Sequence, residues 1–128
     1  MPTVEQLTAA VAEYVRRVGT GTSADIAALY AEDATVEDPV GSPARRGRAD
    51  IADFYSALDP VDITAELLTV RVSGDTAAFH MRVTTTAGDL VTTIEPIDVM
   101  TFDEHGLITS MRAIWSPGDV VVHESASD

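Results

Sequence analysis

The chain has 128 residues, of which 45% are hydrophobic and 23% charged, a balance typical of one soluble globular domain. Its 21 acidic residues exceed the 8 basic ones and give a formal charge of −13, which repels nucleic acid and anionic membranes and leaves neutral small molecules as the best ligands. The sequence has no cysteine, which excludes disulfides, thiolate metal sites and thiol nucleophiles. Because the N-terminus also lacks the pattern of a secretory signal, we expect a cytoplasmic protein.

Three helices are predicted in the first half of the chain. The first begins after Thr3, which can form a capping box with Gln6, and its apolar face includes Tyr14 before Gly19 ends it. A short second helix can begin at Ser23. The second and third helices each present an apolar face, made of Ile26, Leu29 and Tyr30 in one and of Ile51, Phe54, Tyr55 and Leu58 in the other.

The segment between the second and third helices, residues 35–38, is predicted to be extended, because a residue that precedes proline is pushed out of the helical region. The periodicity changes beyond Pro60, where glycine-containing turns separate four runs rich in strand-forming residues. The runs are Ile63–Val72, Ala77–Thr86, Leu90–Asp103 and Leu107–Trp115. We expect an antiparallel meander, followed by a frayed tail over residues 117–128.

Helices followed by a long curved sheet predict a single α+β domain over residues 1–128. In such an arrangement the helices cover one face of the sheet and enclose an apolar pocket.

Asp98 interrupts the pattern of its own strand. Its side chain falls on the face that carries Met100 and Phe102, so an acid lies among apolar residues. A buried carboxylate either pairs with a cation or stays protonated with a raised pKa. Two alternatives remain open: a structural role, with an ion pair to Arg82 or Arg112 or a bend toward solvent, and a functional acid.

Two further polar residues are candidates on weaker grounds. Tyr14 lies on the apolar face of its helix, where a phenol needs a hydrogen-bond partner but is otherwise an ordinary core residue. Asp38 belongs to an acidic run that is typical of a solvated surface, and spacing alone does not separate it from Glu37. Alternation along an extended segment places Asp38 on the same face as Val36, which favours Asp38 as the inward residue.

These residues lie in segments that resemble one known family. Tyr14 is part of EYV, Asp38 is part of LYAEDATVEDP (residues 29–39), and Asp98 is part of IDVMTFDEHG (residues 97–106). From about Thr3 to Trp115 the chain resembles the bacterial Δ5-3-ketosteroid isomerases of the NTF2-like superfamily. The fold that this implies is the NTF2-like cone, with three N-terminal helices packed on a curved antiparallel sheet.

The resemblance also implies an activity. A steroid Δ-isomerase converts 3-oxo-Δ5-steroids to 3-oxo-Δ4-steroids by moving a proton from C4 to C6 through a dienolate. The resemblance makes Asp38 the general base and makes Tyr14 and a protonated Asp98 the oxyanion donors, supported by hydrogen bonds from Tyr30 and Tyr55. A carboxylic acid kept neutral by an apolar site is a known property of this family, and the present sequence matches it with the apolar strand around Asp98.

Strand facing and family position together indicate the residues that line the pocket: Val36, Phe54, Phe79, Met81, Met111 and Trp115. Plain core packing is the alternative for about half of them. The resemblance implies a steroid substrate, no cofactor, no metal and a homodimer packed through sheet faces. No nucleic-acid or membrane partner is expected.

Two other functions remain open, because this fold hosts many chemistries. One is an enzyme such as a cyclase or dehydratase that acts on another flat apolar substrate, and the other is a non-catalytic steroid-binding module. The joint presence of Tyr14, Asp38 and Asp98 argues against both.

Overall fold

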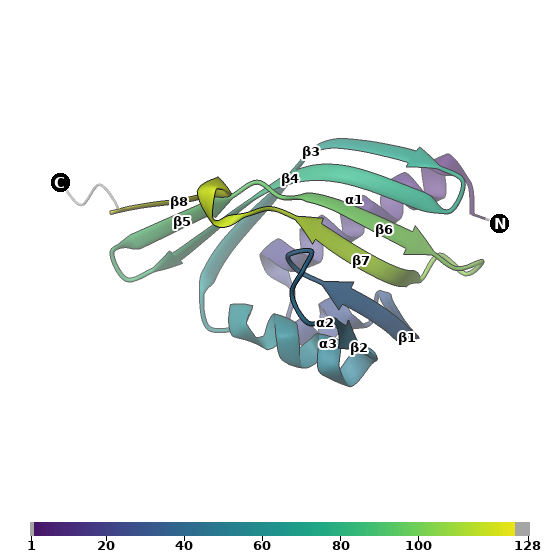
Figure 1. Cartoon of the computed structure of the whole chain (residues 1–128), viewed down its shortest axis with the longest axis horizontal. Coiled ribbons are helices and arrows are strands. Elements are labelled where there is room, and N and C mark those ends of the chain that lie inside the picture. The colour runs from purple at the N-terminus through teal and green to yellow at the C-terminus, as the bar shows by residue number, and fades with distance from the viewer. Residues whose placement is uncertain (1, 125–128) are drawn as a thin grey trace.

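The computed structural model describes residues 2–124. Three helices and one eight-stranded sheet make up the fold (Figure 1). The elements are α1 (Val4–Thr20), α2 (Ser23–Ala27), β1 (Tyr30–Glu37), β2 (Arg45–Arg46), α3 (Arg48–Tyr55) with the 3-10 turn η1 (Ser56–Leu58), β3 (Asp62–Ser73), β4 (Thr76–Ala87), β5 (Leu90–Ile94), β6 (Ile97–Phe102), β7 (Ile108–Ile114), η2 (Pro117–Asp119) and β8 (Val120–Glu124). The predicted α+β class is confirmed.

The first helix forms as its sequence predicts. The Thr3 hydroxyl accepts a hydrogen bond from the Gln6 N–H, and the Gln6 side chain accepts one from the Thr3 N–H, which completes the capping box. Its buried stripe contains Tyr14. The helix runs one residue past Gly19 and ends at Thr20, where the N–H of Gly21 donates to the Arg17 carbonyl.

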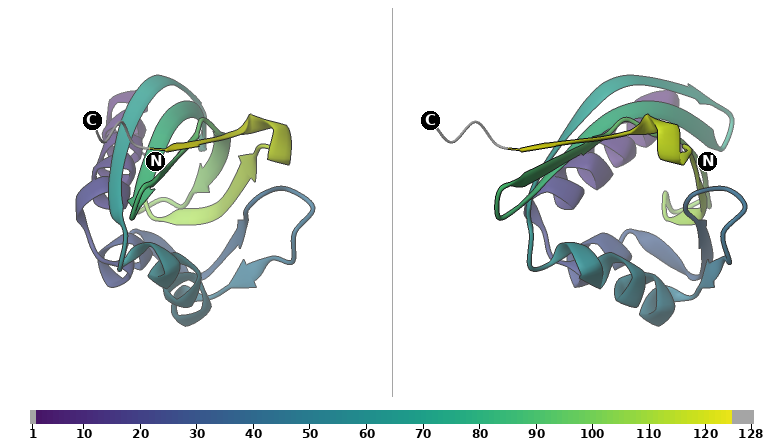
Figure 2. Two further views of the ribbon diagram at one scale, coloured as in Figure 1. Left: turned by 90° about the vertical axis from the view of Figure 1, so that its left-hand side faces the viewer. Right: turned by 60° about the vertical axis from the view of Figure 1, so that its left-hand side comes forward.

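The sheet is curved, and α1 lies against its concave side while α2 and α3 form a second layer (Figure 2). Its strand order is β2-β1-β7-β6-β4-β5-β8, and β3 pairs with β4. The predicted antiparallel meander is confirmed for β3, β4, β6 and β7. The prediction of a wholly antiparallel sheet is wrong, because β1 joins β7 in parallel.

The predicted long strand Leu90–Asp103 is also wrong as one element. It divides at Glu95 and Pro96 into β5 and β6, which pair with successive halves of β4. Proline has no N–H to donate to a strand ladder, so it ends regular pairing.

The frayed tail is corrected as well. Residues 117–124 form η2 and β8, and β8 pairs with β5 from Ile94↔Val120 to Leu90↔Glu124. The run of three valines from Val120 suits a strand, and the open edge of β5 supplies the partner that sequence does not indicate. Residues 125–128 of the predicted tail lie outside the described part of the chain.

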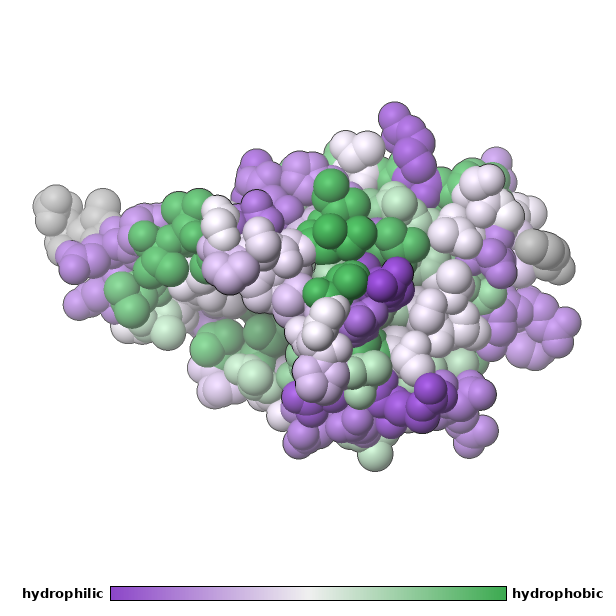
Figure 3. Space-filling model, viewed as in Figure 1, coloured by the Kyte–Doolittle hydropathy of each residue, from purple (hydrophilic) through white to green (hydrophobic). Residues whose placement is uncertain are grey.

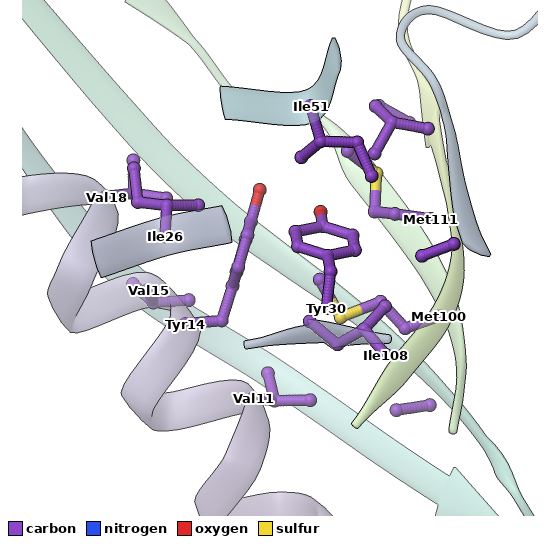
Figure 4. Packing of buried hydrophobic residues seen from close by; sticks show 14 of the residues in the cluster. Val11, Tyr14, Val15, Val18, Ile26, Tyr30, Ile51, Met100, Ile108 and Met111 are labelled. Atoms are coloured by element: carbon purple, nitrogen blue, oxygen red, sulfur yellow. The ribbon is translucent and has the colours of Figure 1, made fainter. Parts of the chain in front are cut away.

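The core lies between α1, the concave face of the sheet and α3. In Figure 4, Tyr14 projects from α1 into a cluster that includes Ile26, Ile51, Met100 and Met111. Within residues 2–124 the helices are too short or too polar to span a membrane.

Candidate active site

A cavity of about 260 Å³ opens beside this core. Its wall is apolar apart from three polar residues, Tyr14, Asp38 and Tyr55. The lining consists of Tyr14, Val18, Asp38, Phe54, Tyr55, Ala57, Leu58, Met81, Val83, Ile94, Pro96 and Trp115. An apolar pocket with a few convergent polar groups is the usual form of a small-molecule site.

Three buried tyrosines form a continuous chain of hydroxyl groups. The Tyr55 hydroxyl lies 2.9 Å from that of Tyr14 and 2.8 Å from that of Tyr30. Tyr14 comes from α1, Tyr30 from β1 and Tyr55 from α3, and in Figure 4 the Tyr14 and Tyr30 hydroxyls both point toward the side where Ile51 of α3 lies. Burial raises the pKa of each tyrosine well above 10, so all three are neutral donors at physiological pH.

One end of this chain is ready to act as a donor. Each hydroxyl has one proton, so a chain in which Tyr30 donates to Tyr55 and Tyr55 to Tyr14 leaves the Tyr14 proton free. Since Tyr14 lines the cavity, that proton can be donated to a ligand oxygen.

Asp98 is buried in a dry environment. Its side chain is 1% exposed, and neither carboxyl oxygen has a hydrogen-bond partner among residues 2–124. Phe79 and Ala113 are its partners on the neighbouring strands. Burial, followed by the negative charge of Asp38, raises the pKa of Asp98 well above 3.8, which favours the neutral form of this carboxyl.

The structural alternatives for Asp98 are contradicted. Arg82 bonds to Glu95 and Arg112 bonds to Glu37, so both cations are engaged elsewhere. The strand does not bend Asp98 toward solvent, because its side chain is among the fully buried ones.

Asp38 is held at the wall of the cavity by an indole. The Trp115 Nε1–H donates to Asp38 Oδ1 over 2.6 Å. Partial burial raises the pKa of Asp38 above 3.8, while the hydrogen bond from Trp115 lowers it. The indole hydrogen bond therefore favours the ionised form of Asp38, and Asp98 has no such donor among residues 2–124. Glu37 points elsewhere and bonds to Arg112 and to the Gly41 N–H, so Asp38 is the acid that faces inward.

The predicted lining residues divide into two groups. Phe54, Met81 and Trp115 line the cavity. The other three predicted residues, Val36, Phe79 and Met111, are buried in the core behind the wall and are not part of the lining. Asp98 is likewise absent from the lining, although its strand partner Phe79 packs edge-to-face on Tyr14 with ring centroids 5.9 Å apart.

Several lining residues lie outside the set predicted from sequence, although most carry a signal. Val18 follows Tyr14 by one helical turn, and Val83 follows Met81 on the same strand face. Ile94 and Pro96 precede Asp98 with the same alternation. Leu58 lies on the apolar face of the third predicted helix, and only Ala57 has no sequence signal.

Known proteins resemble the chain in sequence and in fold. The SnoaL-like domain matches residues 11–111. The Steroid Delta-isomerase of Nocardioides simplex is 58% identical over 117 residues, which are 91% of this chain and 95% of that protein.

Among solved structures, the epoxide hydrolase/cyclase-like enzyme SalBIII, which has a role in pyran ring formation in the polyether salinomycin, has a TM-score of 0.86. It is 30% identical, and the match covers 93% of this chain and 97% of SalBIII. RV0760c from Mycobacterium tuberculosis matches with a TM-score of 0.85 at 20% identity over 96% of this chain and all of that protein, which shows a shared fold.

These matches confirm the NTF2-like α+β fold and the family resemblance. The chain belongs to the SnoaL-like domain family and, within it, to the steroid Δ-isomerases.

Proposed function

We propose that the chain converts 3-oxo-Δ5-steroids to 3-oxo-Δ4-steroids by moving a proton from C4 to C6 through a dienolate. The proposal rests on the 58% identity to the Steroid Delta-isomerase and on an apolar cavity with one acid, Asp38, in its wall and a second acid, Asp98, fully buried on the strand that pairs with Phe79. No cofactor is required, because both the base and the oxyanion donors are side chains of this chain.

Asp38 is the general base. Its carboxylate lies on the cavity wall, and the Trp115 indole stabilises its ionised form. Asp38 takes the C4 proton, which the neighbouring C3 ketone makes acidic, and returns it at C6. Because C4 and C6 are close together and are reached from the same face of the ring system, a single carboxylate serves both transfers. Such a base contributes about 10²–10⁴-fold to the rate.

Tyr14 and Asp98 stabilise the dienolate at its oxygen. Negative charge collects on O3 between the two proton transfers, and a donor preorganised at that position is worth roughly 10²–10³-fold in a site that excludes water. Tyr14 offers its hydroxyl from the cavity wall, with Tyr55 and Tyr30 bonded behind it. Asp98 is the second donor of this proposal, in its neutral form. It is buried outside the lining and is paired with Phe79, which packs on the Tyr14 ring.

The observation that carries this proposal is the contrast between the two acids. Asp98 has no hydrogen-bond partner within residues 2–124, so burial favours its neutral form, whereas Asp38 receives an indole hydrogen bond that favours its anion. A neutral acid and an anionic base beside one apolar cavity are the two groups that enolisation requires.

The direct test mixes the purified protein with 5-androstene-3,17-dione and follows the absorbance of the conjugated enone. We expect turnover far above the buffer rate. Asp38→Asn should lower kcat by at least about 10²-fold while steroid binding, followed by quenching of Trp115 fluorescence, persists. The matched control is Glu37→Gln, whose carboxylate faces away. Turnover at the buffer rate by the unmodified protein would refute the isomerase proposal.

SalBIII gives the cyclase alternative its main support, because it is 30% identical with the same fold. The lower identity, compared with 58% for the isomerase, makes this the second candidate. Failure of the steroid assay together with cyclisation of a polyether epoxide would favour it.

We also propose a homodimer in the cytoplasm. Ile97 of β6 and Ile114 of β7 are direct partners on the convex face, and their side chains are about half exposed. A contiguous apolar pair on an open sheet face supports association with a second copy. Light scattering should give twice the chain mass of 13.6 kDa, and Ile97→Asp should halve it. Cell fractionation tests the location.

A further inference from the structure

We propose that the concave face of the β5–β8 ribbon binds an aliphatic chain at the end of the steroid remote from the ketone. The substrates of this site would then include 3-oxo-Δ5-steroids that carry a branched hydrocarbon side chain. The inference rests on the proposed isomerase function, because that function determines which end of the substrate lies near Asp98.

Residue positions along β4 indicate the distance from the ketone end of the cavity. Phe79 marks the ketone end, because it is the strand partner of Asp98 and packs on the Tyr14 ring. Met81 and Val83 follow on the same face, and both line the cavity. Four residues of an antiparallel strand span about 13 Å, comparable with the length of four fused rings. Val83 therefore marks the level at which the ring system ends.

The last turn of α1 covers the wall at this same level. Ala65 of β3 is the strand partner of Val83. Gly19 packs so closely there that an added Cβ would lie 3.2 Å from the Ala65 nitrogen. Since α1 ends at Thr20, the wall one level further out loses this cover.

The same face of the sheet continues beyond this level with apolar and threonine side chains and one acid at its far end. Val83 pairs with Ile94, and Ile94 pairs with Val120. Directly paired residues of antiparallel strands project from the same face, so the next levels follow from the register. They contain Thr85, Thr92 and Val122, and then Ala87, Leu90 and Glu124.

We call Leu90, Thr92, Val120 and Val122 the outer shelf. From Ile94 to Leu90 it extends about 13 Å beyond the cavity. Figure 1 shows the β5–β8 ribbon reaching past the helices. Figure 3, which views the side on which α1 lies behind the sheet, shows apolar residues on the ribbon from that side. Val122 is 55% exposed and Leu90 is 52% exposed.

Continuity with the cavity identifies the occupant. Single exposed apolar residues are ordinary, but these recur at successive levels of one face that begins at the cavity lining. A chain attached to the distal ring would leave the cavity over the paired side chains of Val83 and Ile94 and lie along the shelf. Burying its hydrocarbon there is favourable by about 25 cal/mol per Å². The acid on this face, Glu124 at its far end, disfavours an anionic substituent.

The test compares two substrates in three proteins. The quantity is the ratio of kcat/KM for 5-cholesten-3-one, supplied in cyclodextrin, to kcat/KM for 5-androstene-3,17-dione, which lacks the side chain. Val122→Ser should lower this ratio about threefold to tenfold without changing turnover of the shorter steroid. Val121→Ser is the matched control, because Val121 is 58% exposed on the opposite face of the same strand and should leave the ratio unchanged.

Three outcomes would overturn the inference. Equal ratios in all three proteins, with normal turnover of the shorter steroid, would show that the outer shelf does not bind the side chain. The proposed isomerase function would still stand. A change of mass in light scattering for Val122→Ser alone would make the shelf a contact between copies. If the unmodified protein converts neither substrate, the proposed function and this inference are both refuted. Leu90→Ser should repeat the effect of Val122→Ser.

Discussion

Asp98 and Asp38 are the same side chain in two different surroundings. Asp98 lies between strands with Phe79 and Ala113 as its neighbours, and burial raises its pKa well above 3.8. Asp38 is also partly buried, but the indole of Trp115 bonds to its anion. Within the described part of the chain, Asp98 has no hydrogen-bond donor beside it and is suited to donate as a neutral acid, whereas Asp38 accepts a bond from Trp115 and is suited to take a proton.

Replacing Trp115 should shift the pH dependence of the reaction. Because the indole hydrogen bond lowers the pKa of Asp38, Trp115→Phe removes this stabilisation of the anion and raises that pKa further. The acid limb of the kcat/KM profile should therefore move to higher pH. Steady-state kinetics between pH 4 and 8 measures the shift. An acid limb at the same pH in both proteins would show that the indole does not tune the base.

The protonation of Asp98 should be visible in stability. Its pKa in the folded state is raised, so between about pH 3.9 and that folded value the unfolded chain has lost a proton that the native protein keeps. The contribution of Asp98 to the free energy of unfolding is largest below about pH 3.9. Between that pH and the folded-state pKa it falls by about 1.4 kcal/mol per pH unit.

Asp98→Asn should remove that slope, because an amide does not titrate. Urea unfolding at pH 5, 6, 7 and 8 gives the free energy of unfolding for both proteins. Asp38 contributes equally to each, so the difference between the two slopes reports Asp98. Identical slopes would mean that Asp98 is already ionised in the folded protein.

At the scale of elements, three hydroxyl groups join α1, β1 and α3. Tyr55 is the centre of this chain and bonds to both Tyr14 and Tyr30. The chain therefore holds the donor on α1 in position through residues that are 16 and 41 places away in sequence.

Loss of the central hydroxyl should cost more than loss of the terminal one. Tyr55→Phe leaves the buried hydroxyls of Tyr14 and Tyr30 without their partner, and each such group costs about 1–3 kcal/mol. Tyr30→Phe leaves the bond between Tyr55 and Tyr14 intact. We expect Tyr55→Phe to be less stable than Tyr30→Phe by about 1–2 kcal/mol in urea unfolding, with the larger loss of kcat. Equal losses, or a larger one for Tyr30→Phe, would contradict this order.

The elements that sequence predicts well are those with strong local signals. The capping box at Thr3 and the apolar stripe through Tyr14 are local, and α1 forms where they place it. The break at Pro96 is signalled by the proline, but the alternation of apolar residues continues across it and predicts one long strand. Pairing of β8 with β5 is non-local, so the local pattern of residues 117–124 predicts only a tail.

At the scale of the whole molecule, the charge of −13 acts on any substrate that approaches. A neutral steroid does not interact with this field, whereas one that carries a sulfate on its distal ring is repelled. Salt screens such repulsion, and the screening length falls from about 30 Å at 0.01 M to about 10 Å at 0.1 M.

The kcat/KM of the sulfated steroid should therefore rise with ionic strength while that of the neutral parent stays constant. Initial rates at limiting substrate between about 0.01 and 0.5 M NaCl measure both. The same salt dependence for the two substrates would show that the net charge does not influence substrate entry.

The sequence by itself determined the fold class, the placement of Tyr14 on a buried helical face and the presence of an acid in an apolar strand. Periodicity and burial cost are local properties, and they were sufficient for these conclusions. Only the tertiary structure decided that Arg82 and Arg112 are engaged by other acids, that Trp115 bonds to Asp38, and which apolar residues line the cavity. Each of these depends on how far side chains from distant segments reach after the sheet has curved, which the order of residues along the chain does not specify.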